Sequence, residues 1–201
     1  NFGSALPGLG DINKDGYDEL KVLSKNYSAV FSTKHGGQMM EFGFFDTLFN
    51  WQNTLMRREE AYHDKILNFK PVETQKPTTS TKDEIETIHG DASSIDENLK
   101  KELIYDWYHK YSFIDHFSDE EFSFDNFKNL TFNEVGDFVN QPFELKKSKN
   151  SFVRDGGIYM NQPYQTKVQK DYKFKKDKIE LNLDVDTKYS NELFYAMEFN
   201  L

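Results

Sequence analysis

The sequence predicts an all-β protein, a large antiparallel β-sandwich with one short helix and long loops. Segments of strand-like composition recur at regular intervals, and turn-forming residues separate them. Residues 179–185 alternate between apolar and polar side chains, which is typical of a half-buried antiparallel strand with one wet face. Although only 37% of the residues are hydrophobic, nineteen Phe and eleven Tyr supply enough ring area for a core.

The first half of the chain predicts a β-meander. Apolar side chains dominate residues 20–23, 28–33 and 39–45, and Asn, His and Gly separate these runs. Gly36 and Gly37 supply the conformational freedom that a tight turn between the second and third strands requires.

The second half predicts further strands at residues 138–145, 152–160, 166–174, 179–185 and 193–199. Turns are expected at residues 148–150, 155–157 and 175–178. Before these strands, the aromatic residues 103–117 contain the adjacent pair Asp115 and His116. Neighbouring residues of a strand point to opposite faces, so this pair cannot share one ligand site, and structural roles are expected for both.

One loop and one helix interrupt the strands. Residues 70–92 are polar and begin with a Pro- and Thr-rich stretch, which predicts an exposed loop inside a single domain that spans residues 1–201. Ser94 and Glu97 frame a capping box, and apolar residues follow at helical spacing, so a helix is expected from about residue 94 to 101. Because the chain begins with Asn rather than Met and ends inside a predicted strand, we expect a fragment of a longer protein.

Charge and composition exclude several classes of partner. The formal net charge is −9 and the sequence has no basic stripe, which argues against nucleic-acid binding. No apolar run is long enough to span a membrane, so no membrane partner is expected. The chain contains no cysteine, which excludes disulfides and thiolate metal sites.

Residues 10–20 predict a calcium loop, because oxygen-bearing side chains at alternate positions precede a glycine that permits a sharp turn. Position 22 is Val, so the loop lacks the final Glu of an EF-hand. The alternative is a β-turn rich in Asx residues that needs no metal. The expected ligands are the side chains of Asp11, Asn13, Asp15 and Glu19 and the backbone carbonyl of Tyr17.

Residues 51–63 hold the densest group of polar and aromatic side chains, among them Trp51, Arg57, Arg58, Glu59 and His63. Trp51 would offer an apolar face to a sugar ring, and its polar neighbours would supply directional hydrogen bonds. The alternative is an internal ion-pair network that fixes a long loop, with Glu59 and His63 one helical turn apart. The structural alternative is favoured on residue types alone.

The calcium-like loop, the strand with Gly36 and Gly37 and five later stretches, in this order, resemble the C-terminal region of glycoside hydrolase family 57, which contains α-amylases and 4-α-glucanotransferases. The later stretches are residues 53–63, 88–89, 105–106, 111–117 and 194–201, of which the run from Leu55 to His63 is the most specific. The resemblance implies a galactose-mutarotase-like supersandwich beside a catalytic barrel. It also implies that the catalytic carboxylates lie on that barrel, so no catalytic residue is assigned here, and it favours a cytoplasmic location.

We therefore expect a non-catalytic accessory domain of an α-glucan-active enzyme, with the catalytic barrel of the same polypeptide and an α-glucan or maltooligosaccharide as partners. The cluster at residues 51–63 would be the barrel interface or a glucan-binding edge. One alternative is a self-sufficient, calcium-dependent carbohydrate-binding module in which Trp51 or Trp107 stacks on a sugar. Another is a mutarotase-like enzyme that uses a His and a Glu as acid and base.

Overall fold

The computed structural model describes residues 6–52, 54–68 and 97–201, which form two compact units. The larger unit comprises the chain up to Met56 and from Asp106 onward, and the smaller unit comprises Arg57–Tyr105. The smaller unit contains the helices α1 (His63–Leu67) and α2 (Glu97–Glu102), and α2 lies where a helix is expected. The predicted loop at residues 70–92 and the start of the predicted capping box lie outside the described residues.

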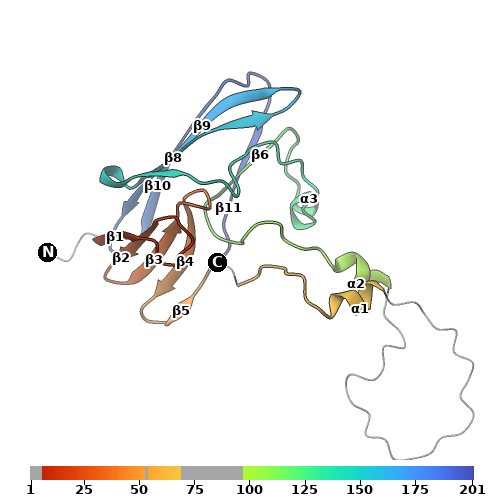
Figure 1. The fold of residues 1–201 in the computed structure, drawn as a ribbon, viewed down its shortest axis with the longest axis horizontal. Coiled ribbons are helices and arrows are strands. Elements are labelled where there is room, and N and C mark those ends of the chain that lie inside the picture. Colours follow the sequence, from red (N-terminus) through yellow and green to blue (C-terminus); the bar gives the residue numbers. More distant parts are fainter. Residues whose placement is uncertain (1–5, 53, 69–96) are drawn as a thin grey trace, which may run out of the picture. The chain divides into compact units, whose positions relative to one another are not determined.

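The first half of the larger unit forms a five-stranded antiparallel meander in chain order (Figure 1). Its strands are β1 (Leu6–Gly10), β2 (Glu19–Leu23), β3 (Tyr27–Ser32), β4 (Gln38–Phe44) and β5 (Phe49–Asn50). The meander prediction is confirmed, but the sequence pattern did not indicate β1 or β5. Strand β1 contains Pro7, which is compatible with the place of this strand at the sheet edge, and β5 is only two residues long.

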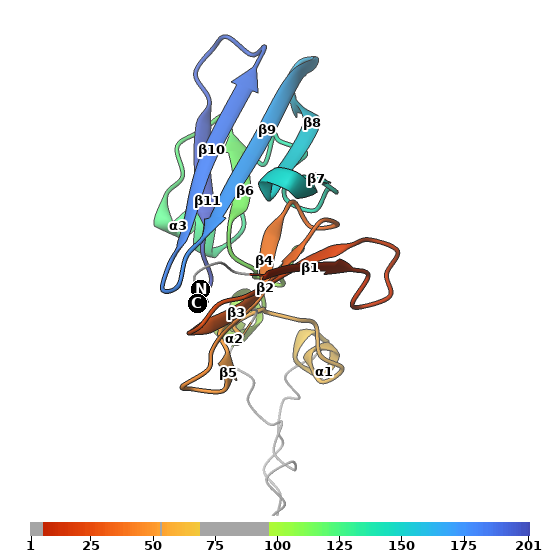
Figure 2. The same cartoon turned by 90° about the vertical axis from the view of Figure 1, so that its left-hand side faces the viewer.

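The second half forms a four-stranded antiparallel sheet in the order β10-β9-β8-β7, with the long β9–β10 hairpin prominent in Figure 2. Its strands are β7 (Glu144–Lys146), β8 (Ser151–Tyr159), β9 (Pro163–Phe174) and β10 (Ile179–Thr187). The expected turn at residues 155–157 is wrong, because these residues pair with β9 inside β8.

The predicted strand at residues 138–145 is also wrong, apart from its last two residues, which belong to β7. Pro142 has no N–H group to donate to a strand ladder. The carbonyl groups of Asp137 and Pro142 accept hydrogen bonds from the guanidinium group of Arg154, at 2.9 and 3.2 Å, instead of from a neighbouring strand.

A third, two-stranded sheet pairs β6 (Ile114–Ser118) with β11 (Phe194–Glu198). Both views show these strands beside β9 and β10 (Figures 1 and 2). Asp115 and His116 are fully buried in β6 and contact different partners on its two faces, as expected for adjacent strand residues.

Aromatic side chains from the two larger sheets meet in one core, which confirms a β-sandwich. The ring of Phe31 in β3 lies 4.7 Å from that of Tyr172 in β9 and 6.2 Å from that of Phe152 in β8. The helix α3 (Phe124–Lys128) begins with a capping box in which the Ser123 hydroxyl accepts from the Asn126 N–H. No helix of the described residues is long and apolar enough to cross a membrane.

Candidate functional site

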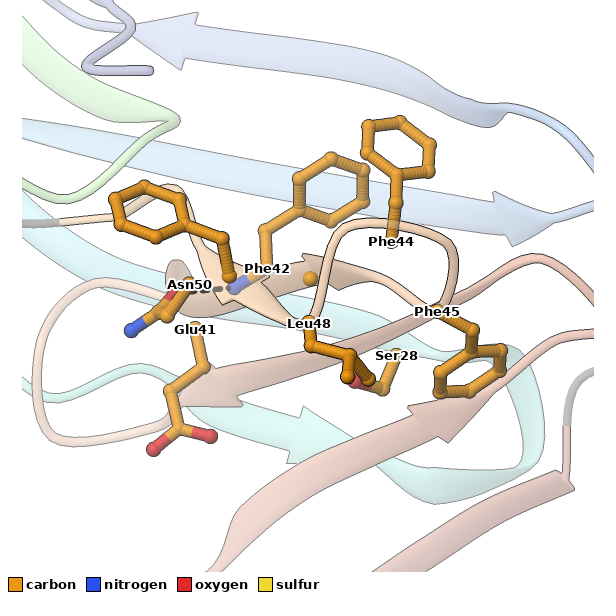
Figure 3. A pocket seen from close by; sticks show the side chains of 9 residues that line it. Ser28, Glu41, Phe42, Phe44, Phe45, Leu48 and Asn50 are labelled. Carbon is orange, nitrogen blue, oxygen red and sulfur yellow. Dashed lines mark hydrogen bonds between the residues drawn. The ribbon is translucent and has the colours of Figure 1, made fainter.

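A pocket of about 240 Å³ opens at the β4–β5 hairpin of the larger unit (Figure 3). The side-chain oxygen of Asn50 accepts the backbone N–H groups of Phe42, at 3.0 Å, and Gln52, at 3.2 Å, which fixes the open end of the hairpin. The pocket is lined by residues of β3, β4, β5 and the hairpin turn, namely Ser28, Glu41, Phe42, Gly43, Phe44, Phe45, Leu48, Phe49 and Asn50.

The turn of this hairpin directs apolar side chains outward. The carbonyl of Phe44 accepts the backbone N–H groups of Thr47 and Leu48, both at 3.2 Å. Leu48 has a left-handed backbone, with φ at 52°, and its side chain is 91% exposed. A positive φ is uncommon for a residue with a bulky side chain, so the turn holds Leu48 in a strained conformation.

Four half-exposed rings surround the turn, belonging to Phe44, Phe45, Phe49 and Trp51. Phe49 is 51% exposed and Trp51 is 38% exposed, and their rings meet edge to face at 5.2 Å. We call these four rings and Leu48 the hairpin patch. Such a surface can bind the apolar face of a ligand, while the Glu41 carboxylate and the Asn50 amide at the pocket supply polar contacts.

The sequence pattern indicated only Trp51 of this patch. Residues 44–49 carry three Phe and one Leu around a turn, where polar residues are the norm, and this run of apolar residues was the available signal. The sequence pattern places the first two Phe residues in the predicted strand at residues 39–45. Only the exposed fractions of the folded side chains distinguish a surface ring from a core ring.

The predicted cluster at residues 51–63 is divided between the two units, since Trp51 belongs to the larger unit and Arg57, Arg58, Glu59 and His63 to the smaller one. The pairing of Glu59 with His63 along a helix is wrong, because α1 begins only at His63. The Nδ1 atom of His63 accepts the backbone N–H of Glu60 at 3.1 Å instead.

His63 is buried within the smaller unit and its ring stacks on that of Tyr105 at 5.5 Å, with an angle of 26° between the planes. Glu59 and Arg58 are exposed. Burial raises the pKa of the Tyr105 phenol, and the nearby carboxylates of Glu59 and Asp64 raise it further. This packing fits the structural alternative for His63 and leaves the charged side chains at the surface.

Trp107 does not join Trp51 in any ring contact of the described residues. Its ring is 51% exposed and meets the ring of Tyr108 edge to face at 4.7 Å. The Trp107 carbonyl accepts a hydrogen bond from the Asn140 side chain at 3.3 Å.

A network of charged groups lies inside the larger unit around His116. The two ring nitrogens of this residue lie 2.7 Å from a carboxylate oxygen of Glu134 and 2.9 Å from one of Glu198. Lys110 and Tyr108 each donate to Glu198, at 2.9 and 2.7 Å.

The pKa values of this network follow from burial and from its hydrogen bonds. Burial alone would raise the pKa of Glu198, but the donors His116 and Lys110 lower it to about 2. Burial would lower the pKa of His116, but the hydrogen bonds to Glu134 and Glu198 raise it above its usual value. Both shifts favour the charged forms of the two side chains.

Aromatic rings enclose this histidine, which has no exposed surface. Rings that contact the imidazole belong to Tyr108, Phe122, Phe127 and Phe132. A general acid or base must reach the proton that it transfers, and His116 is enclosed by protein. The network thus stabilises the interior of the larger unit.

The predicted calcium loop connects β1 and β2. The carboxylate of Asp11 accepts the backbone N–H groups of Asp15, at 2.9 Å, and Gly16, at 3.0 Å. Burial raises the pKa of Glu19, whose carboxylate accepts from the Ile12 N–H at 2.7 Å and the Asn13 amide at 3.2 Å. The Asn13 side chain also accepts the Asp15 N–H at 3.0 Å, which is an Asx turn as in the alternative explanation.

Metal ligation by the loop has no direct support from the geometry. In the part of the chain that the structure describes, no three His, Asp or Glu side chains converge to hold a metal ion. The Tyr17 N–H donates to the Asp15 carboxylate at 3.0 Å, which continues the same pattern of turns. Calcium binding by the loop stays a prediction.

Comparisons with known proteins agree with this fold. The profile of the family described as alpha-amylase/4-alpha-glucanotransferase, C-terminal, matches residues 11–201. The 4-alpha-glucanotransferase of Thermococcus litoralis is 32% identical over 130 residues, which are 65% of this chain and 19% of that protein. The alpha-amylase of Pyrococcus furiosus is 29% identical over 128 residues, which are 64% of this chain and 18% of that protein.

The crystal structure of the 4-alpha-glucanotransferase from Thermococcus litoralis has the same fold over 98% of this chain and 27% of its own. The TM-score is 0.76 at 24% sequence identity. The chain spans about a fifth of the length of the curated relatives that it matches. The resemblance found in the sequence is confirmed, and the chain belongs to the family of C-terminal domains of α-amylases and 4-α-glucanotransferases.

Proposed function

We propose that this chain is a non-catalytic accessory domain of an α-glucan-active enzyme and that its hairpin patch binds α-glucan. The observation that carries the proposal is the group of four half-exposed rings beside the pocket at the β4–β5 hairpin. Its relatives named above are a 4-alpha-glucanotransferase and an alpha-amylase, both several times longer than this chain. The remaining part of such an enzyme would supply the catalytic barrel.

The chemistry of the pocket suits a sugar chain. A glucose ring has an apolar face of C–H groups, which packs on an aromatic ring, and a rim of hydroxyl groups, which donate and accept hydrogen bonds. Phe49, which lines the pocket, and Trp51, whose ring contacts that of Phe49, offer the rings. Glu41 offers an exposed carboxylate that accepts from hydroxyl groups. The polar side of the pocket would therefore orient a chain that the rings hold.

The same pocket lacks the groups for cleavage. Hydrolysis of a glycosidic bond by the common mechanisms requires two carboxyl groups that flank the bond. Among the described residues that line the pocket, Glu41 is the one acidic residue. We expect the chain to release no shorter sugars from maltoheptaose and not to accelerate the interconversion of glucose anomers. Either activity in the purified chain would contradict the non-catalytic role.

Isothermal titration of the chain with maltoheptaose tests the binding site. We expect saturable binding that Phe49→Ala and Trp51→Ala each weaken about tenfold, since a lost ring contact of about 1.4 kcal/mol changes the affinity by that factor. Phe124→Ala is the matched control, because Phe124 is an 81% exposed ring on α3, outside the hairpin. No binding by the wild-type chain, or equal loss in the control, would reject the glucan site.

A further inference from the structure

Lys170 and Asp115 form a fully buried pair in the larger unit. Lys170 lies in β9 and Asp115 in β6, so the pair joins two different sheets. The Nζ atom of Lys170 lies 2.6 Å from Oδ2 of Asp115, and both side chains are 0% exposed. The attraction within a buried ion pair must offset the free energy lost when both charges leave water. Proteins in which apolar residues replace such a pair are often equally stable.

The groups around the pair hold both side chains in place. The Tyr195 hydroxyl donates to Oδ1 of Asp115 at 2.8 Å, and Nζ of Lys170 donates to the Phe113 carbonyl at 2.8 Å. Phe113 has a φ of 66°, which is rare for a residue with a large side chain. Despite its short distance from Nζ, Oδ2 of Asp115 makes no contact with hydrogen-bond geometry within the described part of the chain.

Burial makes the neutral form of the Lys170 amine accessible. Desolvation lowers the pKa of the Lys170 ammonium group, although the nearby Asp115 carboxylate acts in the opposite direction. Transfer of one proton from Nζ to the carboxylate gives an amine with a free electron pair beside a carboxylic acid, and removes two buried charges. The Tyr195 phenol keeps its proton, because burial raises its pKa, and so remains a hydrogen-bond donor to the carboxyl group.

We propose that Lys170 and Asp115 are joined by an intramolecular amide bond that forms after folding. The electron pair of Nζ attacks the carboxyl carbon of Asp115, a C–N bond forms, and the C–O bond to the protonated oxygen breaks. That oxygen leaves as water with one proton from the amine. Nothing is oxidised or reduced, and no second reactant is needed. Tyr195 is the catalytic donor, since its O–H stabilises the negative charge that develops on Oδ1.

The mass of the intact, denatured wild-type chain is the first test. The expected mass is lower than that of the sequence by one water molecule, and tandem mass spectrometry of a tryptic digest should find the peptides with Asp115 and Lys170 joined. A mass equal to that of the sequence would overturn the proposal. Loss of a water molecule at another position, for example by cyclisation of an Asp side chain, would also overturn it.

The chain contains its own matched control. Nζ of Lys175 lies 2.8 Å from Oε1 of Glu180, about as close as the atoms of the buried pair, but both of these side chains are partly exposed. Their peptides should stay separate in the same digest, because solvated, charged partners do not condense. Asp115→Ala and Lys170→Met should each restore the full sequence mass. Loss of water that persists in either variant would contradict the assignment to this pair.

Tyr195→Phe keeps the ring and removes only the donor. We expect this variant to fold like the wild type but to form the amide bond more slowly. The unreacted fraction immediately after synthesis should therefore be larger, and the heights of the mass peaks with and without the lost water, followed over time, measure it. An unchanged rate of bond formation would overturn the role given to Tyr195, while the bond itself is judged on the wild-type mass. These measurements do not depend on glucan binding.

Discussion

Nε2 of His116 and Oε2 of Glu198 lie 2.9 Å apart in the interior of the larger unit, although the two residues are separated by 82 positions in the sequence. The contact crosses the β6–β11 pair, in which His116 faces Ala196 in register and Glu198 faces Ile114. Glu198 also accepts from Asn200 at 2.8 Å and thereby anchors the end of β11. The interior of this sandwich therefore contains a satisfied polar network as well as an aromatic core.

Removing Glu198 should strongly destabilise the larger unit. The substitution Glu198→Ala leaves His116 and Lys110 without a shared anionic partner in a buried site, and we expect the free energy of unfolding to fall by about 3 kcal/mol. Urea unfolding followed by tyrosine and tryptophan fluorescence measures this change. Glu144→Ala is the control, because the pair of Glu144 with Lys146 is exposed, and its effect should be far smaller. Equal effects would argue against the network as a source of stability.

The same pair predicts how stability depends on pH. The pKa of Glu198 is lowered to about 2 from 4.5, so its contribution is complete above pH 4.5 and is lost as the pH falls towards 2. The pKa of His116 is raised from 6.5, so its contribution is complete below pH 6.5 and is lost as the pH rises through the raised value. The network should contribute most between pH 4.5 and 6.5.

Unfolding by urea at a series of pH values checks this window. The difference in free energy of unfolding between the wild type and His116→Gln should shrink above pH 6.5, because the variant cannot carry the charge that the wild type loses there. A difference that stays constant up to pH 9 would show that the histidine is not charged in the folded protein.

Gly37 should not tolerate a side chain. Its φ is 63°, and a Cβ atom built there would lie 2.6 Å from Cγ of Phe152 in the core. We expect Gly37→Ala to lower the free energy of unfolding by about 2 kcal/mol, from backbone strain and overpacking together. Gly10→Ala is the control, because no atom of the described residues lies within 4 Å of its added Cβ and its φ is not positive. A Gly37→Ala variant as stable as this control would contradict the packing described.

Asp11→Ala should loosen the β1–β2 connection whether or not calcium binds there. The variant loses the acceptor for the N–H groups of Asp15 and Gly16, and we expect a loss of about 1 kcal/mol in the free energy of unfolding. If the loop also binds calcium, added Ca²⁺ raises the melting temperature of the wild type and not that of the variant. Equal melting curves with Ca²⁺ and with chelator would reject the metal site.

Chelation also separates the two proposals for sugar binding. None of the Asp11 loop residues lines the pocket at the β4–β5 hairpin. We therefore expect maltoheptaose to bind equally with Ca²⁺ and with chelator. Affinity that falls by tenfold or more on chelation would favour the calcium-dependent carbohydrate-binding module instead.

Much of the strand arrangement was predictable because the period-two pattern is local. Residues 166–174 and 179–185 carry their own alternation, and β9 and β10 lie there within a few residues. The opposite faces of Asp115 and His116 followed from the same geometry. The predicted strand at residues 138–145 is wrong because composition alone cannot show that an arginine on another strand donates to the backbone carbonyl of Pro142.

By itself, the sequence determined the all-β class, most of the antiparallel strands and the family, since each depends on residue types along a continuous stretch. Tertiary structure alone decided that Glu198 contacts His116, that Lys170 meets Asp115, and that the rings of Phe44, Phe45 and Phe49 lie at the surface. The physical reason is that burial and pairing depend on which strands become neighbours. A phenylalanine has the same hydrophobicity in a core as on a hairpin, and only the packing around it shows which role it has.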